Sequence, residues 1–169
     1  ESFFCVSPIH NQIIADVANS VTLDGAITSS DVDAKLNTAA RQVVPSMLIH
    51  RMRSHVNSKI VQSISLGFSP DTLTIGIELH NAASRSSRKI SDLINGSLSE
   101  ASLLELEHAY RTEYEKCFAD GTWRSKIPGR EILKRFVDLA KMPVGYEVFR
   151  NLLVKRMVEI SHKPEGMNN

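Results

Sequence analysis

The stretch QSISLGFSPDTLTIGIELH, residues 62–80, decides the predicted fold because its hydrophobic period differs from that of the rest of the chain. Apolar residues alternate with small or polar residues in two runs on either side of Ser-Pro-Asp-Thr (69–72). That tetrapeptide is typical of a turn. Alternation on both sides of a short turn predicts a β-hairpin with strands at about 62–68 and 72–80. One face of this hairpin would be apolar, so we expect helices to cover it.

Outside this stretch the hydrophobic period is that of a helix. The clearest example is the ladder Leu48, Met52, Val56 and Ile60, in which apolar residues recur every four positions. Apolar residues recur every three or four positions in most other segments as well. We expect helices over residues 8–20, 29–44, about 48–60, 86–95, 98–119, 129–141 and 144–161.

Two local signals set the expected limits of the second helix. Thr28, Ser29 or Ser30 can cap its beginning, because a side-chain oxygen there can accept a hydrogen bond from the first backbone N–H groups. Pro45 should end or kink it, because proline has no N–H to donate and its ring clashes with the preceding turn. The ladder that begins at Leu48 is therefore expected to form a helix of its own.

Together these elements predict an α+β fold that is mostly helical, with about six helices packed on the β-hairpin. The chain has 169 residues, 42% of them hydrophobic and 23% charged, which are ordinary values for one globular domain. We expect that domain to cover residues 1–162, followed by a flexible tail at 163–169.

Several classes of protein lack their usual sequence signals here. No apolar run reaches the ~18 residues that a membrane helix needs, so no membrane partner is expected. No signal peptide is visible, and Cys5 and Cys117 fit no metal or redox spacing, so an intracellular, cytoplasmic protein is expected. No nucleophile, phosphate-loop or metal-binding motif is present, so we expect a non-enzymatic protein with no cofactor and no metal.

Charge is sorted along the sequence although the net charge is only +1. No carboxylate lies between Asp33 and Asp71. Residues 92–120 carry seven acids against two bases, whereas residues 121–163 carry ten bases against four acids. Sorted charge can create a local anion-binding surface that the net charge hides. The alternative is that acidic and basic helices neutralise each other inside the molecule.

The leading hypothesis is a basic surface that contacts the phosphate backbone of a nucleic acid without reading bases. Arg51 and Lys59 share one side of the expected helix, and Arg53 lies elsewhere on its turn. Trp123 is the one candidate for stacking on a base, or else it caps the core at a helix junction. The predicted nucleic-acid-binding residues are Arg51, Arg53, Lys59, Arg124, Lys126, Arg130, Lys134 and Arg135.

The alternative hypothesis is a protein–protein interaction or self-assembly module. Its support is the exposed edge of the expected hairpin together with the leucine-rich helix at 98–119, which could pack against a second copy of the chain or another protein.

Overall fold

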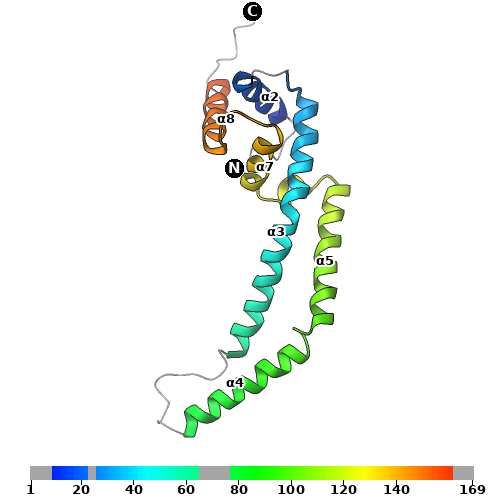
Figure 1. Cartoon of the computed structure of the whole chain (residues 1–169), viewed down its shortest axis with the longest axis vertical. Coiled ribbons are helices and arrows are strands. Elements are labelled where there is room, and N and C mark those ends of the chain that lie inside the picture. The colour runs from blue at the N-terminus through cyan, green and yellow to red at the C-terminus, as the bar shows by residue number, and fades with distance from the viewer. Residues whose placement is uncertain (1–8, 23–25, 65–76, 162–169) are drawn as a thin grey trace, which may run out of the picture. The chain divides into compact units, whose positions relative to one another are not determined.

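The computed structural model describes residues 9–22, 26–64 and 77–161, and every regular element within these ranges is an α-helix (Figure 1). In chain order the helices are α2 (Ile9–Val21), α3 (Ser29–Ile64), α4 (Ile77–Asn95), α5 (Glu100–Ala119), α6 (Trp123–Lys126), α7 (Gly129–Leu139) and α8 (Tyr146–Ser161).

The prediction of an α+β fold with a β-hairpin is wrong. No described residue lies in a strand, and the described ends of both expected strands are helical, because α3 continues to Ile64 and α4 begins at Ile77. The rest of the expected hairpin, residues 65–76, lies outside the described residues. In α3 the Ser63 hydroxyl donates to the carbonyl oxygen of Lys59, four residues earlier, at 2.9 Å. Short alternating runs do not exclude a helix, and here the longer helical periods on both sides extend into them.

The expected break at Pro45 is also absent, because α3 is a single helix of 36 residues with Pro45 inside it. Pro45 is exposed, while Val43 and Leu48 on either side of it are buried. Proline removes one backbone hydrogen bond from a helix. The two helices expected at 29–44 and about 48–60 nevertheless form one element.

Thr28, one of the three expected candidates, caps α3. Its hydroxyl accepts a hydrogen bond from the N–H of Asp31 at 3.1 Å and donates to the Asp31 carboxylate at 2.6 Å. The backbone N–H of Thr28 donates to the same carboxylate at 3.0 Å, which completes a reciprocal capping arrangement. The side-chain and backbone hydrogen bonds from Thr28 lower the pKa of Asp31, so the cap is strongest above the ordinary aspartate pKa and weakens as the pH falls through the lowered value.

The chain divides into two compact units. Unit 1 consists of the described parts of Glu1–Val44 and Lys116–Asn169, and unit 2 is the described part of Pro45–Glu115. The prediction of one folding domain stays a prediction, because only an unfolding experiment tests it. The expected tail at 163–169 lies outside the described residues.

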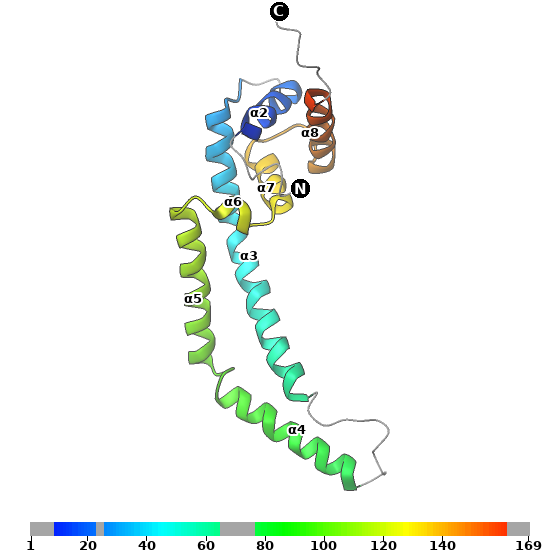
Figure 2. The ribbon, with the colours of Figure 1, turned by 180° about the vertical axis from the view of Figure 1, so that it is seen from behind.

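Unit 1 contains most of the hydrophobic core. Its helices α2 and α7 both pack against α8 (Figure 2). Phe136 of α7 and Phe149 of α8 are fully buried, and their ring centroids lie 5.9 Å apart. Of the 21 buried apolar residues that the structure describes, 18 belong to unit 1.

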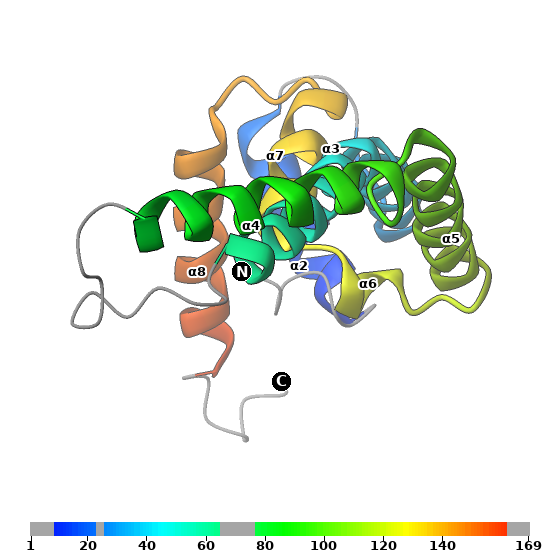
Figure 3. The ribbon, with the colours of Figure 1, turned by 90° about the horizontal axis from the view of Figure 1, so that it is seen from below.

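Unit 2 consists of the second half of α3, α4 and most of α5. The second half of α3 lies beside α5 (Figure 1), and Arg51 of α3 makes an ion pair with Glu113 of α5. Helices α4 and α5 point in different directions on either side of the turn at 96–99 (Figure 3). Only Leu48, Ala82 and Tyr114 are buried apolar residues in the described part of this unit. The described residues of unit 2 therefore form very little core.

Candidate interaction surface

The first predicted basic patch lies on the part of α3 that belongs to unit 2. Arg51 is not a free cation, because its guanidinium makes an ion pair with Glu113 of α5 at 2.7 Å and lies 3.9 Å from the ring centroid of Tyr110. Partial burial acts to lower the pKa of Arg51, but the hydrogen bond and charge of Glu113, together with Tyr110 and Tyr114, outweigh it and raise the pKa. This cation is engaged inside unit 2.

The other two residues of this patch lie on different sides of α3. Arg53 is exposed, whereas Lys59 is half-buried. Lys59 follows Arg51 by eight residues, so the two share the side of α3 on which Arg51 contacts α5. Neither Arg53 nor Lys59 makes an ion pair with a residue that the structure describes. The three cations do not form one continuous surface.

The second predicted patch belongs to unit 1, where three of its five cations are engaged. Arg124, whose side chain is only 12% exposed, makes an ion pair with Asp33 and lies over the Trp123 ring at 4.7 Å. Lys134 makes an ion pair with Glu131 at 3.3 Å. Arg130 also has an interaction within the chain. Lys126 and Arg135 are exposed and make no ion pair among the described residues.

Trp123 occupies the core rather than a binding surface. It is 4% exposed, and its ring stacks on Phe118 with centroids 6.0 Å apart. A base stacks only on an exposed aromatic face. The interpretation of Trp123 as a core residue at a helix junction is confirmed.

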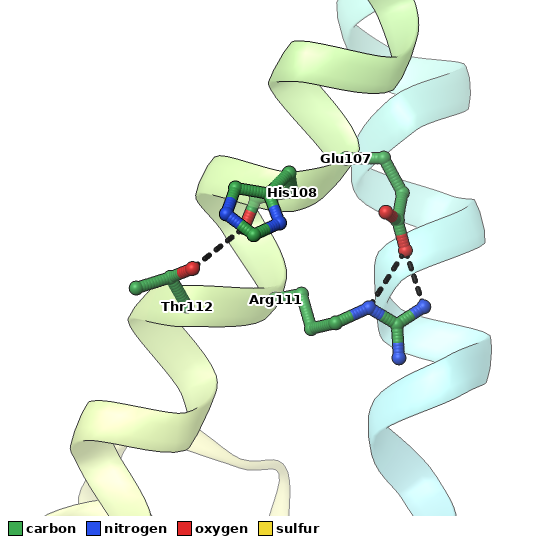
Figure 4. A network of polar contacts seen from close by, with 4 residues as sticks. All are labelled: Glu107, His108, Arg111 and Thr112. Carbon is green, nitrogen blue, oxygen red and sulfur yellow. Dashed lines mark hydrogen bonds and ion pairs between the residues drawn. The ribbon is translucent and has the colours of Figure 1, made fainter.

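Three further cations, Arg111, Arg150 and Arg156, are paired with a carboxylate on their own helix. In α5 the Glu107 carboxylate accepts hydrogen bonds from Arg111, one turn later, while the Thr112 hydroxyl donates to the carbonyl oxygen of His108 at 2.9 Å (Figure 4). Arg150 and Arg156 of α8 are paired in the same way with Glu147 and Glu159. Such exposed pairs contribute at most about 1 kcal/mol each to stability, and none of these three cations belongs to the predicted binding residues.

Sequence reasoning missed the exposed apolar surface of unit 2. Ile49 of α3 is 62% exposed, Leu104 of α5 is 61% exposed and Ile94 of α4 is 56% exposed. Helix α8 of unit 1 also has four exposed aliphatic side chains, so exposure alone does not single out unit 2. What distinguishes unit 2 is that these side chains lie on helices with few buried apolar residues among those described. The sequence showed that Ile49 and Leu104 are apolar residues within helical segments. It did not show that they are exposed, because exposure depends on which parts of a helix the other helices cover.

Two rows of residues define the candidate surface. The α3 stripe consists of residues spaced by four, three and four, which share one helix face: Ile49, Arg53, Val56 and Ile60. The α5 stripe has the same kind of spacing and consists of Glu100, Leu104, Glu107, Arg111 and Glu115. Val56, Ile60 and Glu107 are half-buried, and the other members of both stripes are exposed.

One depression among the described residues lies between α2 and α8 and has a volume of about 180 Å³. It is smaller than the roughly 300–1,000 Å³ of typical ligand pockets. Among the residues with described positions, no group of three or more His, Cys, Asp or Glu could hold a metal ion. Within the same ranges, no helix is long and apolar enough to span a bilayer.

In comparisons with known proteins, no family model, no curated protein and no solved structure matches this chain. Function is therefore inferred from the geometry of this chain alone.

Proposed function

We propose that this chain is a protein-interaction module and that unit 2 binds another protein chain through the exposed faces of its helices. The observation that carries the proposal is the contrast between the two units. Unit 1 holds 18 of the 21 buried apolar residues among those described, whereas unit 2 holds three. Helices gain most of their stability from packing an apolar face. The described helices of unit 2 have little such packing, so a partner would supply more of it. We also propose that the protein acts inside the cell.

A double substitution tests the proposal. Ile49→Ser with Leu104→Ser removes the two most exposed of these apolar side chains of unit 2, and Val154→Ser removes a 45% exposed side chain of α8 in unit 1 as the matched control. We expect the labelled wild-type chain to sediment faster than an 18.8 kDa monomer, either alone or in a native extract of the cells that make it. The double variant should sediment as a monomer in both, because burial of apolar area drives association.

Either of two results would overturn this function. One is a wild-type chain that sediments as a monomer both alone and in the extract. The other is a complex that the double variant forms as well as the wild type and the Val154→Ser control do. Circular dichroism on all three proteins shows whether their helices form equally.

Nucleic-acid binding is the second candidate, supported by the four predicted cations that make no ion pair within the described residues: Arg53, Lys59, Lys126 and Arg135. Phosphate contacts release counterions, so affinity falls with salt by a log–log slope of about −0.9 per contact. Four contacts give a slope of at most about −4 for duplex DNA, against about −7 for all eight predicted residues. Filter binding at several salt concentrations measures this slope. No binding at low salt, or binding that salt does not weaken, rejects the candidate.

A further inference from the structure

We infer that the partner of unit 2 is a second copy of this chain, with the α3 stripe of each copy packed on the α5 stripe of the other. This inference rests on the proposed function and names its partner. It follows from the chemistry of the two stripes, which differ in charge and lie on the same unit.

The α3 stripe combines apolar residues with one cation. Ile49 is exposed, and Val56 and Ile60, two and three turns further along the same face, are half-buried, so the stripe presents one fully exposed and two partly exposed apolar side chains. Arg53 lies on this stripe, is exposed and has no ion-pair partner among the described residues. The stripe contains no carboxylate. It is therefore suited to a helix that presents an apolar side chain flanked by acids.

The α5 stripe has that complementary composition. Leu104 lies one helical turn after Glu100 and is 61% exposed. Glu100 and Glu115 are exposed and make no ion pair within the described chain, whereas Glu107 and Arg111 neutralise each other. Opposite the α3 stripe of another copy, Leu104 would meet apolar side chains, and Glu100 or Glu115 would come near Arg53.

A second copy satisfies both stripes at once. A twofold axis places the α3 stripe of one copy on the α5 stripe of the other and repeats the same contact on the opposite side. The acids on the α5 stripe of each copy thus pair with Arg53 on the α3 stripe of the other copy. The same pairing occurs twice in the dimer. An unrelated partner would have to match two stripes of different charge.

Reversal of charge on each stripe in turn tests this pairing. Variant A is Arg53→Glu, and variant B is Glu100→Lys with Glu115→Lys. In a dimer of A, the introduced glutamate would face the native acids of α5, and in a dimer of B, Arg53 would face the introduced lysines. We expect each variant to dimerise on the order of 100-fold more weakly than the wild type, because the like-charge contact occurs twice in a twofold dimer.

An equimolar mixture of A and B gives the decisive result. In the A–B heterodimer, one contact joins the introduced glutamate of A to the introduced lysines of B, and the other joins native Arg53 of B to the native acids of A. Both contacts pair opposite charges, so native mass spectrometry should show the heterodimer in large excess over either homodimer, with an affinity near that of the wild type. Recovery in the mixture also shows that both variants fold. Lys155→Glu on the exposed surface of α8 makes the same change of charge as variant A and should leave self-association unchanged.

Three results would overturn the inference. They are a wild-type mass of 18.8 kDa at every concentration, variants A and B that self-associate as well as the wild type, and a mixture without preference for the heterodimer. A wild-type chain that is monomeric alone but forms an Ile49- and Leu104-dependent complex in extract would reject the second copy and leave the proposed function standing.

Discussion

Phe149→Ala should lower the free energy of unfolding of unit 1 by about 3–5 kcal/mol, the usual loss for a phenylalanine removed from a packed core. Phe149 is fully buried in α8, and its ring lies against that of Phe136 in α7. Removal of its ring leaves a cavity between these two helices. The loss therefore combines lost burial with lost packing across the centre of unit 1.

The measurement can be confined to unit 1. Trp123 is the single tryptophan of the chain and is buried in unit 1, so its fluorescence during denaturant unfolding reports on that unit. Val154→Ala in the same helix is the control, because Val154 is 45% exposed and its truncation should change the free energy of unfolding by about 0.5 kcal/mol or less. Equal losses in the two variants would show that α8 does not pack through Phe149.

Pro45→Ala should raise the stability of α3 by about 2–3 kcal/mol. Proline inside a helix costs about 3 kcal/mol, and alanine restores both the missing N–H and a favourable helix propensity. A smaller opposing effect of about 0.4–1 kcal/mol comes from the greater freedom of the unfolded chain without proline. The net gain is large because Pro45 lies in the interior of a 36-residue helix.

Thermal unfolding followed by far-ultraviolet circular dichroism measures this gain. Pro143→Ala is the matched control, because Pro143 is exposed and lies between α7 and α8, outside any helix. Without a helix to repair, that variant should lose up to about 1 kcal/mol of stability. A Pro45→Ala variant that behaves like Pro143→Ala would show that the helix ends at Pro45, as the sequence alone suggested.

Helices α2, α7 and α8 of unit 1 were predictable because their signals are local, whereas the short helix α6 was not predicted. The expected ranges 8–20 and 144–161 correspond closely to Ile9–Val21 and Tyr146–Ser161. Their apolar spacing is regular, and residues that it marks, such as Phe149 and Leu153, are buried. Local spacing also identified Thr28 among the candidate caps of α3.

The errors have a common physical cause, which is that local signals compete with longer ones. Alternation near Ile64 and Ile77 favoured strands, and Pro45 favoured a break, yet in each case a longer helix prevails. One short window of sequence does not show whether a longer helical pattern will prevail over a local signal.

The predicted binding residues show a second limit. Whether a cation is free depends on carboxylates that are distant in sequence, as with Arg51 and Glu113 or Arg124 and Asp33. Spacing along the chain cannot supply these pairs. It also could not reveal that Ile49 of α3 and Leu104 of α5 are left exposed, on which the proposed function depends.

Amide hydrogen exchange at low and high chain concentration tests the central claim most directly. If another copy covers unit 2, peptides that contain residues 49–60 and 100–115 should exchange more slowly as the concentration rises, while peptides of α8 should not change, because burial in an interface suppresses local opening. Exchange at 49–60 and 100–115 that is the same at both concentrations, or protection that rises in α8 instead, would contradict the claim.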